Sequence, residues 1–205
     1  MHRFFLAAAL LVLTAMPAQA AENSTTITGH VFADNWFELY VNGRRVAVDP
    51  IEFTPHNTVP VQFKSSYPMV YAIHAKDFAH PRSGLEYSHT RIGDGGLIAW
   101  FSDATATGPH WKCKVFFAGP LDRSCLNNDP VNSCRVERSP LPANWQAPEF
   151  DDSAWGAAIR HTEEAVRPHG NFYDYKWGGA QFIWTGDLEI DNTIVCRYRA
   201  DGPGN

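Results

Sequence analysis

The sequence predicts an all-β protein, and three observations lead to this prediction. Helical periodicity is nearly absent along the chain. Short runs rich in Val, Ile, Tyr, Phe and Trp recur, separated by Gly, Pro, Asn and Asp, which is typical of a β-sandwich. One of these runs, WFELYVNGRRVAV, has a tight-turn signal at its centre. We therefore expect a sandwich of short strands joined by loops.

The run at residues 36–48 predicts a β-hairpin. Apolar and polar residues alternate up to Val41, and the alternation resumes at Val46 and Val48. Asn42-Gly43 stands between the two halves, and this pair favours the positive backbone angles of a two-residue hairpin turn.

Six further strands are expected, and two long loops lie between them. The strands are residues 58–63, 69–75, 96–102, 112–117, 181–184 and 193–198. The loops are residues 76–95 and 120–144. Residues 150–158, FDDSAWGAA, are expected to form one short helical turn, which Asp151 or Asp152 would cap through a side-chain oxygen.

The N-terminus predicts an exported protein. Residues 1–20 combine a short basic start, an apolar run and the small residues Ala18 and Ala20, as in a signal peptide. No later stretch has the roughly 20 apolar residues that a membrane-spanning helix needs. We expect residues 21–205 to form one domain in the periplasm or outside the cell. The net charge of −5, without a basic patch, makes nucleic acid an unexpected partner. The oligomeric state stays open.

All four cysteines lie in the exported part, where disulfides persist. Of the three possible pairings, we expect Cys125 with Cys134 across a polar loop, and Cys113 with Cys196 between two strand-like segments. A zinc site is the alternative, but the close paired spacing of such sites is missing.

Several segments, in this order, resemble the galactose-binding-like β-sandwich (jelly-roll) modules of bacterial secreted proteins and glycosidases. They are ADNWFELYVNG, YAIHAKDF with GGLIAWFSD, FDDSAW, and AQFIW with the closing CRYRA. The resemblance implies a jelly-roll sandwich, here with long disulfide-restrained loops. It does not imply a ligand, because one fold hosts many functions.

No catalytic machinery is expected. The chain has no G-x-S-x-G motif and no cysteine expected to be free. Asp151 and Asp152 are the obvious carboxylate pair for glycoside hydrolysis, but adjacent residues in a capped turn point apart. We therefore expect a binding protein and not an enzyme.

The stretch TGDLEIDN, residues 185–192, suggests a metal site. Asp187, Glu189 and Asp191, which we call the acidic ladder, occupy every second position. On a regular strand they would lie on one face about 6.5 to 7 Å apart. Three like charges so placed repel one another, so this face is expected to be well solvated, paired with Lys or Arg, or neutralised by a cation. Such a cation, calcium or a lanthanide, takes six or more oxygen ligands, so the ladder would be half a site. The further ligands expected are Asp34, Asn35, Asp174 and Asp94.

Two other groups of residues suggest ligands. His74, His80 and His89 could converge on copper or zinc, although their spacing matches no motif. The aromatic loop NFYDYKWGG contains Tyr173, Tyr175 and Trp177. If these rings are exposed, they suit a carbohydrate, and the alternative function is a carbohydrate-binding module. If they turn inward, they cap the core.

Overall fold

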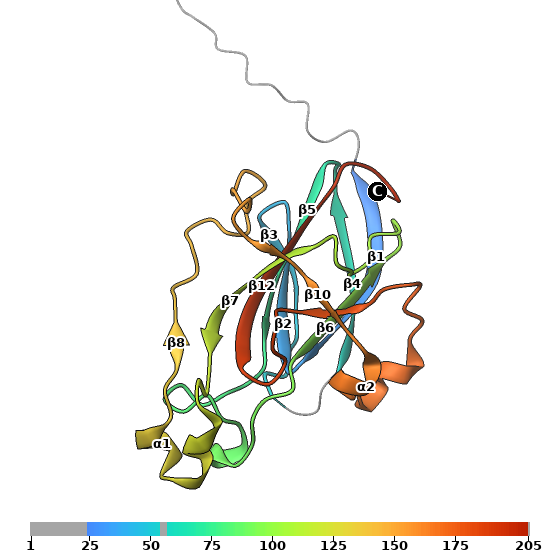
Figure 1. Cartoon of the computed structure of the whole chain (residues 1–205). Coiled ribbons are helices and arrows are strands. Elements are labelled where there is room, and N and C mark those ends of the chain that lie inside the picture. The colour runs from blue at the N-terminus through green and yellow to red at the C-terminus, as the bar shows by residue number, and fades with distance from the viewer. Residues whose placement is uncertain (1–23, 54–56, 205) are drawn as a thin grey trace, which may run out of the picture.

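Two antiparallel sheets pack face to face in the computed structural model, which describes residues 24–53 and 57–204 (Figure 1). The first sheet has the strand order β10-β11-β6-β1-β4. The second has the order β3-β2-β5-β12-β7-β8, and β9 also pairs with β7. The predicted all-β, sandwich-like class is confirmed. The predicted signal peptide lies outside the described residues.

The elements follow one another in a simple order. The strands are β1 Thr25–Asp34, β2 Trp36–Val41, β3 Arg44–Val48, β4 Thr58–Ser65, β5 Met69–Lys76, β6 Gly96–Phe101, β7 Lys112–Ala118, β8 Glu137–Arg138, β9 Gly156–Ala157, β10 Ile159–His161, β11 Phe182–Trp184 and β12 Asp191–Ala200. The helices are α1 Pro130–Ser133 and α2 Glu163–Val166, and the 3-10 turns are η1 Tyr87–His89, η2 Arg123–Asn127 and η3 Gly170–Asp174.

The main core lies between the two sheets, and a smaller apolar cluster covers the outer face of each. In β1, Val31 and Ala33 face the main core, whereas Phe32 faces an outer cluster with Phe172 and Phe182. The other sheet is covered by a cluster of Ala72, Phe116, Trp145, Trp155 and Val195. Large aromatic residues thus pack both in the main core and in the outer clusters.

All the predicted strands are confirmed within two residues at each end. The long strand β1 and the short strands β8, β9 and β10 were not predicted. Strand β1 is central in its sheet, between β4 and β6. Residues 30–34 are buried on both faces. Because both faces are covered, the alternation that marks a half-buried strand is absent there.

The predicted hairpin at Asn42-Gly43 is confirmed. Both residues have positive φ, 48° and 76°, as a two-residue turn between twisted strands requires. The Asn42 side chain also donates to the carbonyl of Ser66 and accepts from the amide of Val70. The turn is thereby tied to the start of β5.

The expected helical turn at residues 150–158 is wrong. Asp151 accepts a hydrogen bond from the amide of Ser153, which closes a tight turn and not a helix. Gly156 and Ala157 then pair with β7. The backbone groups of these two residues form hydrogen bonds with the edge of the sheet and not within a helix.

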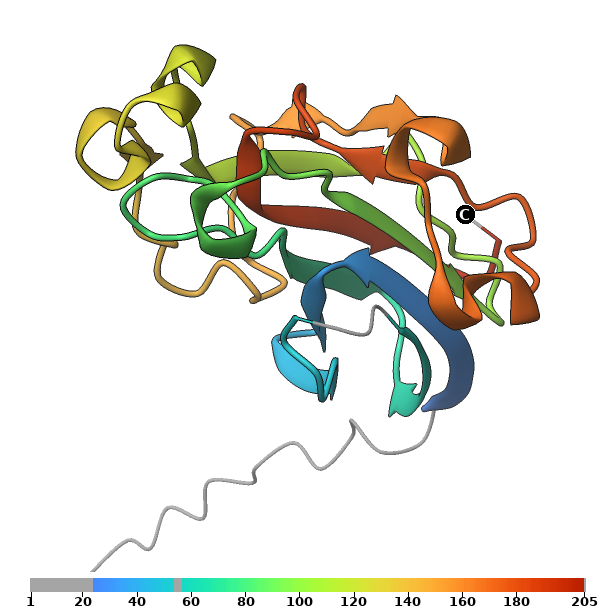
Figure 2. The same ribbon diagram turned by 90° about the horizontal axis from the view of Figure 1, so that it is seen from below.

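Both predicted disulfides are confirmed. Cys113–Cys196 joins β7 to β12, and Cys125–Cys134 closes the loop that contains η2 and α1. The second disulfide packs against Leu85 from the other long loop. The two long loops therefore lie side by side at one end of the molecule, and α2 lies at the opposite side (Figures 1 and 2).

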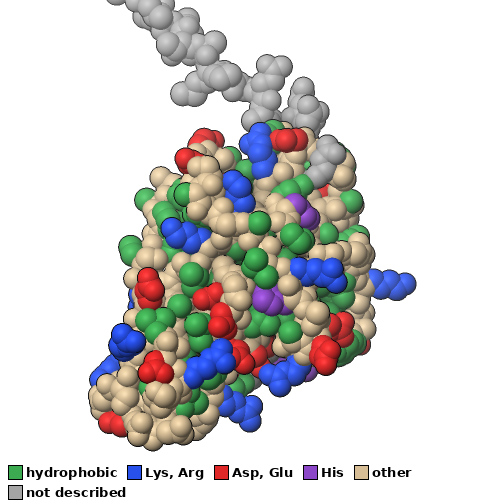
Figure 3. Space-filling model, in the orientation of Figure 1, with side chains coloured by type: hydrophobic (Ala, Val, Ile, Leu, Met, Phe, Trp, Pro, Cys, Tyr) green, Lys and Arg blue, Asp and Glu red, His purple; other side chains and the backbone are tan. Residues whose placement is uncertain are grey.

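Acidic and basic side chains are interspersed over the face shown in Figure 3. Among the described residues, no helix combines the length and apolar character needed to span a bilayer.

Candidate metal centre

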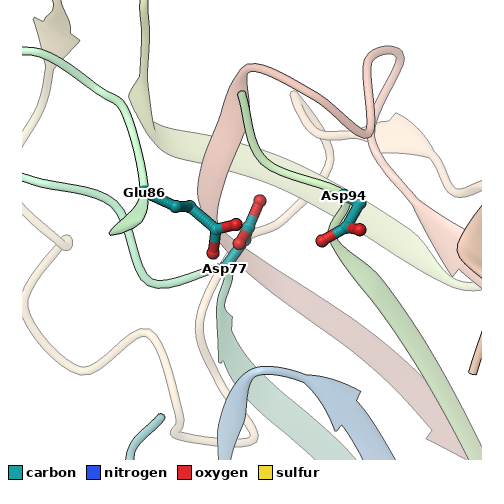
Figure 4. Close-up of side chains that lie close together, drawn as sticks. All are labelled: Asp77, Glu86 and Asp94. Carbon is teal, nitrogen blue, oxygen red and sulfur yellow. The ribbon is translucent and has the colours of Figure 1, made fainter. Parts of the chain in front are cut away.

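Three carboxylates meet where β5 ends and β6 begins. Asp77 directly follows β5, Glu86 belongs to the long loop, and Asp94 comes two residues before β6. One carboxylate oxygen of each lies within 4.8 Å of those of the other two. Figure 4 shows the Asp77 and Glu86 carboxyl groups against each other, with Asp94 directed toward them. We call these three residues the carboxylate cluster.

Backbone hydrogen bonds fix each member of the cluster. The amide of Asp77 donates to the carbonyl of Asn192 in β12, which extends the sheet pairing past β5. The amide of Glu86 donates to the carbonyl of Arg91, which closes the short turn containing η1. The residues on both sides of Asp94 are held by the turn before β12. The cluster is thus built on backbone that the fold holds in place.

Asp77 is buried without a compensating donor. Its side chain is 1% exposed, and neither carboxylate oxygen has a hydrogen-bond partner among the described residues. Burial raises the pKa of Asp77 well above its ordinary value. The charge of Glu86, the hydrogen bond that the two carboxyl groups share when one of them is protonated, and the charges of Asp34 and Asp94 raise it further. Leaving such a group unsatisfied is costly, so the site is suited to a positive charge.

Asn192 adds a fourth oxygen to the same space. Its side chain is fully buried, and its amide nitrogen donates to the carbonyl of Gly119 at 2.7 Å. That hydrogen bond orients the amide and leaves Oδ1 without a partner in the described part of the chain. A methyl group built on Gly93 would overlap Asp77 Oδ2 and lie 3.3 Å from Asn192 Oδ1. Both oxygens therefore border the space beside Gly93.

The acidic ladder lies nearby, but in a turn and not on a regular strand. Asp187 and Glu189 fall in the turn between β11 and β12, and Asp191 begins β12. Arg123 lies 3.5 Å from Asp187 Oδ2 and 2.5 Å from Glu189 Oε2. Asp191 accepts from the hydroxyl of Thr185 at 2.7 Å. Each ladder carboxylate thus has a partner within the protein.

The backbone of the ladder turn supports the carboxylate cluster. The carbonyl of Glu189 accepts from the amide of Gly93, and the carbonyl of Leu188 accepts from the amide of Gly95. These two bonds hold the loop on either side of Asp94. The turn is therefore a neighbour of the cluster, positioned to brace it.

The other expected metal ligands have different places in the fold. Asp34 is buried and close enough to Asp77 to raise its pKa. Asn35 donates to Asp34 and accepts from the amide of Phe78, which ties the end of β1 to the residue after Asp77. Asp174 is exposed at the end of η3, in the aromatic loop. Asp34 and Asp94 are the expected residues that lie at the cluster.

The three histidines do not converge on one site. The rings of His80 and His89 do meet, with centroids 4.2 Å apart. His74 instead lies on β5, where its Nδ1 is 3.6 Å from Glu38 and its ring packs against Trp36. Its place on a strand in the second sheet directs it away from the loop that carries the other two.

The aromatic loop packs largely onto the protein. Trp177 stacks on Phe172 with centroids 4.9 Å apart, and its indole nitrogen donates to the carbonyl of Phe172. Tyr175 lies against His30. Tyr173 is 66% exposed. The loop therefore presents one well-exposed ring, and carbohydrate binding there stays a prediction.

The sequence analysis did not identify Asp77, Glu86 or Asn192 as site residues. Each is a single polar residue at the end of a strand or inside a loop, and no local spacing connects them. A weak signal was present at Asp77, because it follows Lys76 at the end of the strand segment that contains YAIHA.

Comparison of the chain with protein-family models, with curated proteins and with solved structures finds no match. The galactose-binding-like resemblance and the jelly-roll topology that it implies stay predictions.

Proposed function

We propose that this chain is an exported, non-catalytic binding protein that holds a hard metal cation, calcium or a lanthanide, at the carboxylate cluster. The expected ligands are the carboxylates of Asp77, Glu86 and Asp94 and the side-chain oxygen of Asn192. The proposal keeps the class of function expected from the acidic ladder and moves the site to different residues.

The observation that carries the proposal is the unsatisfied burial of Asp77 beside Asn192 Oδ1. Both groups are acceptors, and neither has a donor among the described residues. A proton shared between Asp77 and Glu86 would satisfy one carboxyl pair and still leave the Asn192 oxygen unpaired. A cation satisfies all of these oxygens together.

The donor set favours a hard cation. The cluster and Asn192 offer oxygen atoms and neither nitrogen nor sulfur, which disfavours copper and zinc. Calcium takes six to eight oxygens in flexible geometry and commonly completes its shell with water. Asp34 adds negative charge beside the cluster, as its effect on Asp77 indicates. A lanthanide prefers the same kinds of ligand and carries a larger charge.

Two disulfides support the proposed location outside the cytoplasm. They form and persist in oxidising compartments and are rare in the cytosol. The predicted signal peptide points the same way and would be tested by N-terminal sequencing of the secreted chain.

Thermal unfolding with and without calcium or lanthanum tests the function. The unmodified protein should unfold at a higher temperature with either cation, because an ion that binds only the folded state stabilises it. Asp77→Asn should abolish this shift. Without metal, the same variant should be more stable than the unmodified protein at neutral pH by about 1 to 3 kcal/mol, because an amide donor replaces a buried, repelled charge.

Glu189→Gln is the matched control. It makes the equivalent change on the acidic ladder and should leave the cation shift intact. A shift that survives in Asp77→Asn and disappears in Glu189→Gln would move the metal to the ladder. No shift with either cation in the unmodified protein would refute the function itself.

A further inference from the structure

A groove of about 630 Å³ opens beside the carboxylate cluster. Its lining includes Asp34, Glu86 and Asp94 together with Tyr87, Arg91 and Arg167. Asp77 is buried and does not line this groove. A cation held by the cluster would therefore have its open side toward the groove.

Both arginines line the groove, and Arg167 pairs with the cluster. Arg167 Nη2 is 3.4 Å from Asp94 Oδ2, in a pair whose Arg167 side chain is 73% exposed. The Arg91 guanidinium lies 5.4 Å from the centre of the Tyr87 ring. An exposed ion pair of this length is weak, so a cation that takes up Asp94 would release the Arg167 guanidinium toward the groove.

Cation binding removes the net negative charge of the groove. Without metal, the three acidic groups that line it, together with the buried Asp77, repel an anion. A divalent cation and the two guanidinium groups match the formal charge of these four carboxylates, and a trivalent cation exceeds it. The cation and the arginines then form a site that a carboxylate can bridge, since guanidinium groups bind carboxylates through paired hydrogen bonds.

From this geometry we propose that the groove binds a small carboxylate-bearing ligand, such as an acidic monosaccharide, and binds it only when the cluster holds its cation. The inference rests on the proposed metal site. The volume fits a sugar-sized molecule. The Tyr87 side chain, 42% exposed, supplies an apolar face next to the charged groups.

Calorimetric titration with D-glucuronate tests the proposal. D-glucose is the matched probe because it differs only at C6, where a hydroxymethyl group replaces the carboxylate. With saturating calcium or lanthanum, glucuronate should bind and glucose should not. With a chelator, glucuronate binding should disappear. Arg91→Ala and Arg167→Ala should each weaken glucuronate binding about tenfold, while calcium binding, titrated separately, persists. Arg199→Ala, on β12 and outside the groove, is the control.

The outcomes separate the two proposals. Absence of calcium and lanthanum binding refutes the metal site and the groove ligand together. Cation binding without glucuronate binding refutes the groove ligand alone. Equal binding of glucuronate with chelator, equal binding of glucose, or unchanged affinity in both arginine variants also overturns it.

Discussion

At the scale of single residues, burial sets the chemistry of Asp77. A carboxylate on the surface would be solvated, and the solvent would screen the charges of its neighbours so that they changed its pKa little. At 1% exposure, the charges of Glu86, Asp34 and Asp94 act through a medium that screens them weakly. The same burial that makes an unpaired Asp77 carboxylate costly would make it an effective ligand for the proposed cation.

The raised pKa of Asp77 predicts a pH dependence. In metal-free protein, the folded state binds this proton more tightly than the unfolded chain does, so the contribution of Asp77 to stability is greatest at low pH. It is lost as pH rises above the ordinary value of 3.8 toward the raised one. A cation must displace the proton, so its affinity should increase with pH. Calcium titrations between about pH 5 and pH 8 should show this increase together with proton release. A pH-independent affinity without proton release would contradict it.

Gly93 is the second residue whose identity the site requires. A methyl group at this position would overlap the Asp77 carboxylate. We expect Gly93→Ala to lower the free energy of unfolding by about 1 to 3 kcal/mol and to abolish the calcium-induced shift in melting temperature. Denaturant unfolding with and without calcium measures both effects.

Gly156→Ala is the control for this substitution. A methyl group on Gly156, in β9, meets no atom within 4 Å. The free energy of unfolding of Gly156→Ala should stay within about 0.5 kcal/mol of that of the unmodified protein. The calcium-induced shift in melting temperature should be unchanged. Equal behaviour of the two alanine variants would show that the space beside Gly93 is not required.

At the scale of elements, the loop before β9 is held by a buried ion pair. Arg197 on β12 is 2% exposed, donates to the Asp152 carboxylate at 2.9 Å and reaches the carbonyls of Trp145 and Ala147. Burial raises the pKa of Asp152, but hydrogen bonds from Arg197 and Lys112 outweigh this effect and lower it. The FDDSAW segment therefore has a structural role in this fold.

Asp152→Ala should destabilise the protein strongly. It leaves the Arg197 guanidinium buried without its carboxylate, a change that costs about 3 to 5 kcal/mol. Lys112→Ala removes only the half-exposed partner of the same carboxylate and should cost about 1 kcal/mol or less. Urea unfolding of both variants gives the comparison. If both variants lost a similar free energy of unfolding, the buried Arg197 guanidinium would not require the Asp152 carboxylate as its partner.

At the scale of the whole molecule, two disulfides constrain very different lengths of chain. Cys113 and Cys196 are 83 residues apart, and Cys125 and Cys134 are 9 apart. In the chain-entropy description, closing these loops stabilises the folded state by about 4.5 and about 2.5 kcal/mol.

Removing the Cys113–Cys196 bridge by a double Ala substitution should therefore cost more stability than removing Cys125–Cys134. The second bridge lies beside the loop that carries Glu86. Loss of the Cys125–Cys134 bridge should therefore also weaken calcium binding. Loss of the Cys113–Cys196 bridge should affect calcium binding less. Thermal unfolding and calcium titration of the two double variants check this order, and a reversed order would contradict the loop-closure argument.

Much of the architecture was predictable from local patterns. Alternating apolar residues, Asn42-Gly43 and the positions of the cysteines predicted most strands, one hairpin and both disulfides, since each depends on residues close together in sequence or on the exported setting. β1 was missed because burial on both faces removes the alternation. The helical turn at residues 150–158 was wrong because pairing with β7 outweighed a local capping signal.

The sequence by itself determined the all-β class, the strand segments and the abundance of acidic groups near the end of the chain. Only the tertiary structure decided which carboxylates meet. The regular spacing of the acidic ladder was visible, but its turn pairs these groups with Arg123 and Thr185. Asp77, Glu86, Asp94 and Asn192 come from separate segments, and the register of β5 on β12 with the path of the long loop brings them together. Side-chain convergence of this kind depends on long-range pairing, which local sequence does not encode.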